Sequence, residues 1–232
     1  MNPSSQTQES LRVEVQKELD SQKGHTERNR LGQFATPPDL ALDILRHTRN
    51  LLPSDYRIRF LDPAFGTGAF YSALLNVFPL EQIESALGIE IDSEYGQQAL
   101  ELWAHSSFRL RIADFFALPA PVKDARKPNL IVCNPPYVRH HHIPSPKKEK
   151  LQRLIAKTVG LRLNGLAGLY CYFLLHAHSW LQEGGYACWL IPSEFMDLNY
   201  GNAVKRYLLT KVTLLRIHRF DPQDVQFEDA LV

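Results

Sequence analysis

The feature that most constrains the fold is a strand-like run that ends in a glycine-rich turn and leads directly into a helix. Residues 57–64, Arg-Ile-Arg-Phe-Leu-Asp-Pro-Ala, have the composition of a strand, and residues 65–70 contain Gly66 and Gly68. The apolar residues that follow, between 73 and 77, predict a helix. Strand, glycine turn and helix open the nucleotide-binding type of α/β sheet, although the third glycine of the dinucleotide fingerprint is absent.

Further strand-like runs alternate with helices along the chain. We expect strands at residues 85–92, 108–113, 129–133, 186–192 and 213–220, and the beginning of a seventh strand at 227–232. We expect helices at residues 37–52, 93–104, 168–181 and 201–209, the first with Thr36 as its N-cap and Pro37 at its first position. This order predicts an α/β protein with a doubly wound, mostly parallel, Rossmann-like sheet of the seven-stranded type, its last strand incomplete.

Polar residues stand at the ends of four of these strands, where ligands bind in an open α/β sheet. Asp62 ends the first strand, and Asp114 follows the third. Glu90 and Asp92 end the second strand about 25 residues after the glycine turn, a position suited to accepting hydrogen bonds from ribose hydroxyls.

The run at residues 129–133 ends in Asn134, Pro135, Pro136 and Tyr137. Because Pro136 has no N–H and keeps Pro135 extended, the chain can neither continue a ladder nor begin a helix there. The Asn134 amide and the Pro135 carbonyl then face outward as two acceptors. An exocyclic amino group that donated both its hydrogens to them would direct its lone pair at an electrophile, while the Tyr137 ring stacked on the base. The alternative is a strand that ends in a proline-rich turn beside an unrelated tyrosine.

Composition narrows the class of protein. With 44% hydrophobic and 22% charged residues the chain is typical of soluble globular proteins, and a formal charge of +1 does not by itself indicate nucleic acid. Between residues 139 and 162, however, seven Lys and Arg stand against one acid, which predicts either a solvated helix face or a phosphate-contacting surface.

The cysteines, Cys133, Cys171 and Cys188, lie in apolar runs and suit free thiols in a reducing cytoplasm. No metal motif is present, and no apolar run approaches the ~20 residues of a membrane span.

With these pieces in place, residues 31–232 resemble the S-adenosylmethionine-dependent DNA adenine-N6 methyltransferases, in the group whose cofactor motifs precede the catalytic motif. The order of the motifs carries the resemblance. The catalytic motif at 134–137 has the family pattern (Asp/Asn/Ser)-Pro-Pro-(Tyr/Phe/Trp). It implies cofactor contacts from Thr36 and Pro37 at the methionine end, from Asp62, Pro63, Ala64, Phe65, Gly66, Thr67 and Gly68 in the donor-binding turn, from Glu90 in preference to Asp92 at the ribose, and from Asp114 and Phe115 at the adenine. It implies catalysis by Asn134, Pro135, Pro136 and Tyr137, with Tyr137 and Phe227 against the target base.

The function implied by the resemblance is transfer of a methyl group from S-adenosylmethionine to N6 of an adenine flipped out of double-stranded DNA. No metal is needed, and the chain would be the catalytic part of a cytoplasmic restriction-modification-type enzyme. Three alternatives stay open: a glutamine methyltransferase of release factors, a ribosomal RNA guanine methyltransferase, and a DNA-binding subunit that kept the fold without activity.

The expected domain organisation is a polar arm at residues 1–30, helical or disordered, followed by a methyltransferase catalytic domain at residues 31–232. We assign the arm no chemistry. The basic stretch can contact phosphates, but phosphate contacts carry little sequence information. We therefore expect a separate recognition domain or subunit, and little sequence-specific methylation by this chain alone.

Overall fold

The computed structural model describes residues 3–104, 106 and 108–220. These residues form two compact units, each described by itself below. The described residues of 1–24, 35–134 and 181–189 form unit 1, which contains the sheet. Those of 25–34, 135–180 and 190–232 form unit 2, which is helical.

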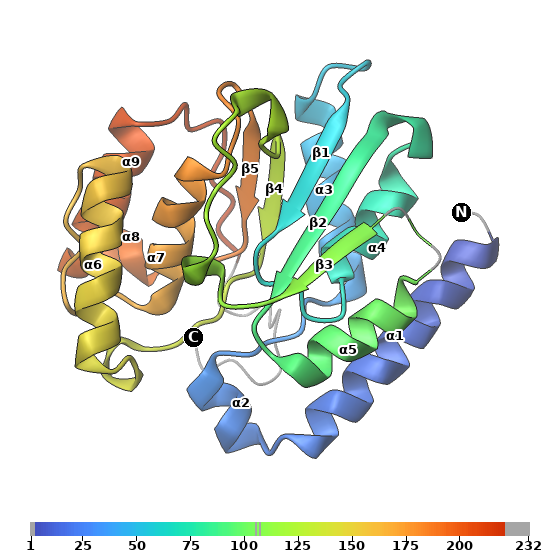
Figure 1. The fold of residues 1–232 in the computed structure, drawn as a ribbon, viewed down its shortest axis with the longest axis horizontal. Coiled ribbons are helices and arrows are strands. Elements are labelled where there is room, and N and C mark those ends of the chain that lie inside the picture. The colour runs from blue at the N-terminus through green and yellow to red at the C-terminus, as the bar shows by residue number, and fades with distance from the viewer. Residues whose placement is uncertain (1–2, 105, 107, 221–232) are drawn as a thin grey trace. The chain divides into compact units, whose positions relative to one another are not determined.

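The sheet of unit 1 has five strands within the described residues, and all its paired strands run parallel. They are β1 (Ile58–Asp62), β2 (Ile83–Glu90), β3 (Phe108–Ile112), β4 (Leu130–Cys133) and β5 (Tyr186–Trp189), in the spatial order β3-β2-β1-β4-β5 (Figure 1). The order reverses between β1 and β4, whose printed register is short, Phe60 opposite Leu130 and Leu61 opposite Ile131. Open α/β sheets bind ligands at such a switch point. The strand order and the parallel pairing confirm the expected α/β class and doubly wound sheet.

One face of the sheet is covered by α3 (Pro38–Leu51), α4 (Ala69–Val77) and α5 (Ser93–Leu102). Alternate strand residues point to this face, because side chains along a strand alternate between its two sides. Phe60 of β1 and Leu130 and Val132 of β4 share one buried cluster with Leu45 of α3 and Leu74 of α4. All four residues of β4 are buried, which fits an apolar run that is covered on both faces.

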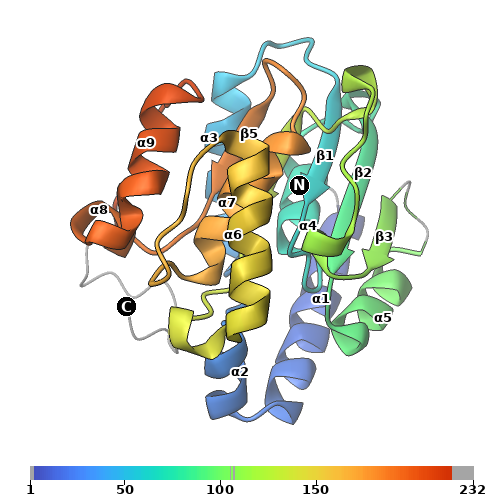
Figure 2. The same ribbon diagram turned by 60° about the vertical axis from the view of Figure 1, so that its left-hand side comes forward.

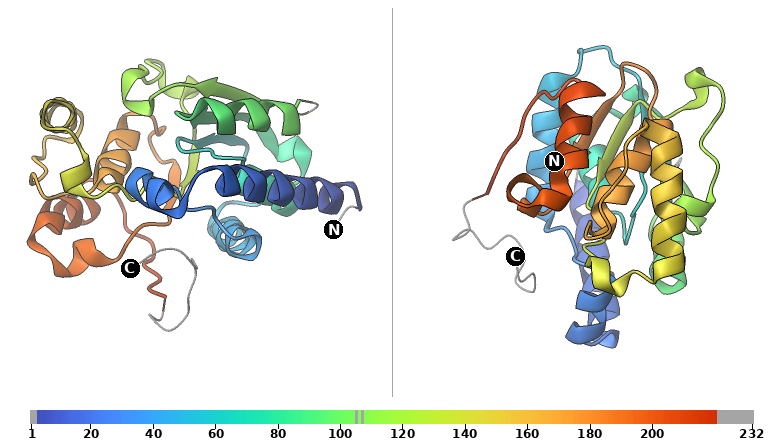
Figure 3. Two further views of the ribbon diagram at one scale, coloured as in Figure 1. Left: turned by 90° about the horizontal axis from the view of Figure 1, so that it is seen from below. Right: turned by 90° about the vertical axis from the view of Figure 1, so that its left-hand side faces the viewer.

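The polar N-terminal segment is helical, forming α1 (Pro3–Gln22), and the left view of Figure 3 shows it running beside α5. It contacts α4 and α5 of unit 1. Leu19 is buried on this side, while Leu11 is half exposed. The helix therefore belongs to the packing of unit 1, although few of its residues are apolar.

Unit 2 is built from helices and short 3-10 turns (Figure 2). They are α2 (His25–Leu31), η4 (His140–His142), α6 (Ser145–Val159), α7 (Leu169–His176), η5 (Ala177–Ser179), α8 (Glu194–Asp197), η6 (Asn199–Gly201) and α9 (Asn202–Thr210). All eight residues of α7 are buried, as its apolar sequence predicts, but the helix gives way to a 3-10 turn at Ala177. Three more 3-10 turns, η1 (Leu80–Gln82), η2 (Phe115–Ala117) and η3 (Asp124–Arg126), belong to unit 1.

Two expectations about secondary structure are wrong. Thr36 is not an N-cap, because α3 begins at Pro38, whose fixed φ suits the first helical position, and Pro37 occupies the cap position. The Thr36 hydroxyl bonds to Asn134 instead. Residues 213–220 do not form the sixth strand, since no described strand pairs with them, and Leu215 and Ile217 are more than half exposed. The start of a seventh strand, with Phe227, lies outside the described residues.

Within the described part of the chain, no helix combines the length and the apolar character that crossing a membrane requires.

Candidate active site

Asp62, the last residue of β1, is a buried carboxyl group at the switch point of the sheet. Its side chain is 1% exposed, and its Oδ1 accepts a hydrogen bond of 3.1 Å from the backbone N–H of Ala64. Burial raises the pKa of Asp62 to about 8, and the nearby charge of Glu90 adds to the rise. The thiol of Cys133 on β4 hydrogen-bonds to the same carboxyl group. A cation placed beside Asp62 would favour its ionised form.

Glu90, the last residue of β2, is held by two backbone N–H groups. Its Oε2 accepts from Gly66 at 2.7 Å, and its Oε1 accepts from Asp92 at 2.8 Å. Burial raises the pKa of Glu90, while these two hydrogen bonds lower it. Each carboxylate oxygen has two lone pairs, so the bonds fix the carboxylate and leave it able to accept from a ligand hydroxyl.

The glycine turn between β1 and α4 requires glycine at two positions. Gly66 has a φ of +55°, and a Cβ at this residue would meet no atom within 4 Å, so a ligand could approach the backbone there. Gly68 has a φ of +93°, and its Cβ would lie 2.6 Å from the Phe65 ring and 2.7 Å from Trp103 Nε1. Open space at the turn beside two carboxyl groups fits a cationic nucleoside such as S-adenosylmethionine.

The other two strand-end acids cap the helices that follow them. Asp92 accepts from the N–H of Glu94 at the start of α5 and forms an ion pair with Lys23. Asp114 accepts from the N–H of Phe116 at 3.0 Å. Phe115 is buried, whereas Ile91, directly after Glu90, is 61% exposed. The sequence pattern did not single out the exposed side chain of Ile91. The ligand roles of Asp114 and Phe115 stay predictions.

Asn134 follows β4 at the same edge of the sheet as Asp62. Its Nδ2 donates a hydrogen bond of 3.1 Å to Thr36 Oγ1, just before α3. This bond gives the NH2 group of the amide a partner on the protein, so that the orientation presents Oδ1 as the acceptor of the side chain. Within unit 1, the structure therefore joins Thr36 to Asn134 and places Asn134 and Asp62 after neighbouring strands of the sheet.

Tyr137 lies in unit 2, in a setting made of carbonyl groups and aromatic rings. Its backbone N–H donates to the Gly32 carbonyl at 3.0 Å, and its hydroxyl donates to the Leu190 carbonyl at 3.1 Å. The Phe34 ring lies 5.6 Å from the Tyr137 ring at an interplanar angle of 33°, and the Tyr170 ring meets it edge-on at 6.5 Å. These contacts fix the ring from its backbone, its hydroxyl and its sides.

Gly32 was not predicted as a site residue. Its φ is +65°, and a Cβ there would lie 2.4 Å from the Tyr137 nitrogen, so the close backbone approach needs glycine. Arg12 contacts Thr67 of the glycine turn and Lys23 contacts Asp92, and the sequence pattern gave neither of these two basic residues a role. The glycine in Leu31-Gly32-Gln33 is the signal that could have led to Gly32.

Known proteins resemble the chain over most of its length. Residues 77–226 match the family model described as Eco57I restriction-modification methylase. The chain belongs to this methylase family. It is 30% identical to the Type II methyltransferase M.AccI of Acinetobacter calcoaceticus over 206 residues, and 32% identical to M.XamI of Xanthomonas campestris pv. amaranthicola over 172 residues. These alignments cover 88% and 71% of the chain, but only 36% and 31% of the two relatives.

Solved structures share the fold at lower identity. The type IIG restriction endonuclease BpuSI is 18% identical, with a TM-score of 0.63 over 88% of this chain and 24% of that one. A Listeria monocytogenes protein assigned to the class I S-adenosylmethionine-dependent methyltransferases is 18% identical, with a TM-score of 0.62 over 85% of this chain and 59% of that one. The methylase family and the methyltransferase fold expected from the sequence are thus confirmed, and S-adenosylmethionine is the cofactor that goes with them. The non-methylating subunit and the release-factor and RNA enzymes are not favoured.

Proposed function

We propose that this methylase chain transfers a methyl group from S-adenosylmethionine to N6 of adenine in double-stranded DNA, as the catalytic part of a restriction-modification enzyme. The observation that carries the proposal is the Asn134 amide, oriented by Thr36 at the sheet edge where the buried Asp62 ends the neighbouring strand. Family membership supports methyl transfer. The Asn-Pro-Pro-Tyr motif, through its resemblance to the adenine-N6 enzymes, supports adenine as the base.

The cofactor side of the proposed site uses charge and exposed backbone. The Glu90 carboxylate accepts from the ribose hydroxyls while Gly66 and Asp92 hold it in place. Asp62 faces the positive charge of the ligand, and the turn around Gly66 lets the ligand approach the backbone. Thr36 and Pro37, with Asp114 and Phe115, complete the contacts that the resemblance implies. Bound S-adenosylmethionine supplies an electrophilic methyl group on its sulfonium.

The acceptor side uses hydrogen-bond acceptors and an aromatic ring. Asn134 Oδ1 and the Pro135 carbonyl accept the two hydrogens of the adenine amino group, and this turns its lone pair toward the methyl group. Pro136 keeps the turn extended, and Tyr137 stacks on the flipped base. Phe227 would pack on the same base. Catalysis comes from positioning and from preorganised acceptors, without a covalent enzyme intermediate.

The basic stretch is proposed to contact DNA phosphates. On α6 the apolar Leu151, Ile155 and Val159 are buried, and Lys150, Arg153 and Lys157 are exposed. Arg153 and Glu149 form an exposed ion pair with 3.8 Å between charged atoms, which contributes little to stability. Cations on one exposed face can neutralise phosphates in a salt-dependent way. Base recognition belongs to a further domain or subunit.

The deciding experiment offers the chain tritiated S-adenosylmethionine with duplex DNA, with RNA and with a release-factor peptide. We expect label in DNA only, weak and not restricted to one short sequence, and recovered as N6-methyladenine after digestion to nucleosides. Label in N4-methylcytosine would overturn the choice of base, and label in RNA or peptide would overturn the choice of substrate. Strong enrichment of one short sequence would contradict the expected separate recognition domain.

The cofactor contact is tested separately by calorimetric titration of S-adenosylmethionine. Glu90→Ala should weaken binding by roughly 1–3 kcal/mol, because the ribose hydroxyls lose a charged acceptor in a partly enclosed site. Glu101→Ala is the matched control, since Glu101 is exposed on α5. An unchanged affinity in Glu90→Ala would move the ribose contact to Asp92.

A further inference from the structure

One face of α1 carries the polar side chains Arg12 and Gln16 together with the buried Leu19, at intervals of four and three residues. Lys23 comes just after the helix and continues this spacing, since its N–H donates to the Leu19 carbonyl. Arg12 is only 2% exposed. Its guanidinium donates to Glu9 Oε2 at 2.9 Å and to Thr67 Oγ1 at 3.0 Å. A buried guanidinium is stable only when its donors are satisfied, and here one of its partners is in the glycine turn.

Thr67 stands between Gly66 and Gly68 and is fixed from three directions. Its hydroxyl accepts from Arg12 and donates to Gln16 Oε1 at 2.7 Å. Its carbonyl accepts from Trp103 Nε1 at 2.9 Å. Because the two flanking glycines lend the turn no side-chain contacts, these bonds to Thr67 join the backbone bonds of Gly66 and Gly68 in fixing its path.

The C-terminal end of α1 reaches the second cofactor-side turn. Lys23, just after the helix, forms an ion pair with Asp92, and its Nζ lies 4.7 Å from the centre of the Tyr95 ring. The Tyr95 hydroxyl donates to Asp20 Oδ1 at 2.6 Å. The N–H of Asp92 in turn donates to Glu90. One helix therefore contacts both segments that hold Glu90, the Gly66 turn and the Asp92 turn.

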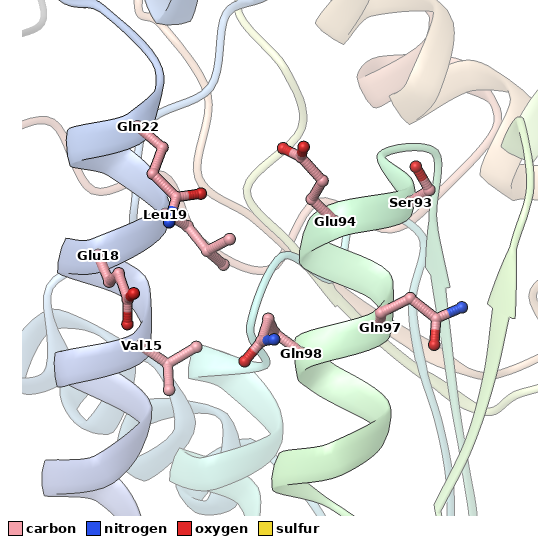
Figure 4. A pocket seen from close by; sticks show the side chains of 8 residues that line it. All are labelled: Val15, Glu18, Leu19, Gln22, Ser93, Glu94, Gln97 and Gln98. Carbon is pink, nitrogen blue, oxygen red and sulfur yellow. The ribbon is translucent and has the colours of Figure 1, made fainter.

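Between these two points α1 and α5 are in contact and also border a groove of about 380 Å³. It is lined by four residues of each helix, and six of the eight are polar (Figure 4). Val15 and Leu19 are its only apolar lining residues. Few apolar side chains line the groove, so the polar contacts at Arg12 and Lys23 add to the packing that holds α1 in place.

We propose that α1 is part of the methyl-donor site, with Arg12 and Lys23 as positioning residues for the turns that bind S-adenosylmethionine. The inference rests on the proposed function, since it takes Glu90 and the Gly66 turn as cofactor contacts. Arg12 acts through Thr67, and Lys23 acts through Asp92 on Glu90. A helix that merely stabilised unit 1 would affect unfolding but not the affinity of the folded protein for the donor.

The test is a double-mutant cycle on S-adenosylmethionine affinity, measured by calorimetry on the full 232-residue chain. Arg12→Met and Thr67→Val should each weaken binding about tenfold, the effect of losing one hydrogen bond to a charged group. The double variant should be no weaker than Thr67→Val alone, because both changes remove the same contact. Thr67→Ser, which keeps the hydroxyl, should bind like the wild type.

Lys17→Met is the matched control on the same helix, since Lys17 is exposed and should leave the affinity unchanged. Lys23→Met should weaken binding by several-fold. If Arg12→Met does not fold, Thr67→Val decides the point from the other side of the contact. A lower unfolding temperature with unchanged affinity in the variants would overturn the inference alone. Failure of the wild type to bind S-adenosylmethionine would overturn the proposed function, and the inference with it.

Discussion

The carboxylates at the strand ends and Tyr137 are fixed in different ways. Asp62 and Glu90 lie at the ends of central strands, are buried, and are oriented by backbone N–H groups of the turns beside them. Tyr137 is oriented by carbonyl groups of distant segments, at Gly32 and Leu190, and by two aromatic rings. In the first region burial and charge control the ionisation of the carboxyl groups, whereas in the second hydrogen bonds and ring packing orient the tyrosine. Substitutions should therefore separate donor binding from transfer.

Asn134→Ala should give the largest separation. It removes the acceptor proposed for the amino group and leaves Asp62 and Glu90 in place, so turnover should fall on the order of 10²-fold or more while donor affinity is retained. Single-turnover methylation and calorimetry measure the two quantities. Asn202→Ala is the matched control, because Asn202 is exposed at the start of α9. Wild-type turnover in Asn134→Ala would show that the amide has no catalytic part.

Gly32→Ala should damage the tyrosine region alone. The left-handed backbone costs a residue with a Cβ about 1–2 kcal/mol, and contact of that Cβ with the Tyr137 nitrogen adds to this cost. Denaturant unfolding should report lower stability, and turnover should fall at unchanged donor affinity. Gly24→Ala is the control, since a Cβ there meets no atom and its φ is ordinary. Equal stability of the two variants would contradict the close approach.

The pH dependence of donor binding should test the carboxylate region. Because the pKa of Asp62 is about 8 in the folded protein and near 4 in an unfolded chain, the folded state holds an extra proton between these values. Without ligand, the free energy of unfolding should therefore fall as pH rises from about 4 to about 8. Affinity for the cationic donor should rise with pH up to about 8, by at most about tenfold per pH unit, because the donor favours the ionised form of Asp62.

Asp62→Asn should remove the contribution of Asp62 to this profile, while the raised pKa of Glu90 contributes a slope of the same sign. Proton release on binding, measured in buffers of different ionisation enthalpy, reports the same linkage. An identical pH profile in wild type and Asp62→Asn would assign the titration to another group.

Tyr137→Phe should have the smallest effect. It removes the hydroxyl bond to the Leu190 carbonyl but keeps the ring, so stability should fall by only about 1 kcal/mol and turnover should stay close to wild type. Thermal unfolding and methylation assays measure the two outcomes. A loss of turnover as large as that in Asn134→Ala would mean that the hydroxyl, rather than the ring, serves the reaction.

The central sheet was predictable because its strands are apolar or alternating runs, such as Phe108–Ile112, that end near glycine, proline or acidic residues. The part proposed for α1 was not, because Arg12 and Gln16 share a helix face with the buried Leu19 but lack its hydrophobicity. Thr36 is of a residue type that often caps helices, but Pro38 is the first helical residue and Pro37 occupies the cap position. The run at 213–220 has strand-forming residues, but a strand also requires a partner, which sequence pattern alone does not provide.

The short strand β4 also sets the direction in which Asn134 points. Leu130 and Val132 face the helix α3, whereas Cys133 faces away from it and hydrogen-bonds to Asp62. Side chains alternate along a strand, so Asn134, two residues after Val132, points again to the side of Thr36. Loss or gain of a single residue within 130–133 would invert this parity and turn the amide away from Thr36. Insertions of two residues would keep the direction but move the amide along the strand. Homologous chains should therefore vary in the composition of this strand far more readily than in its length.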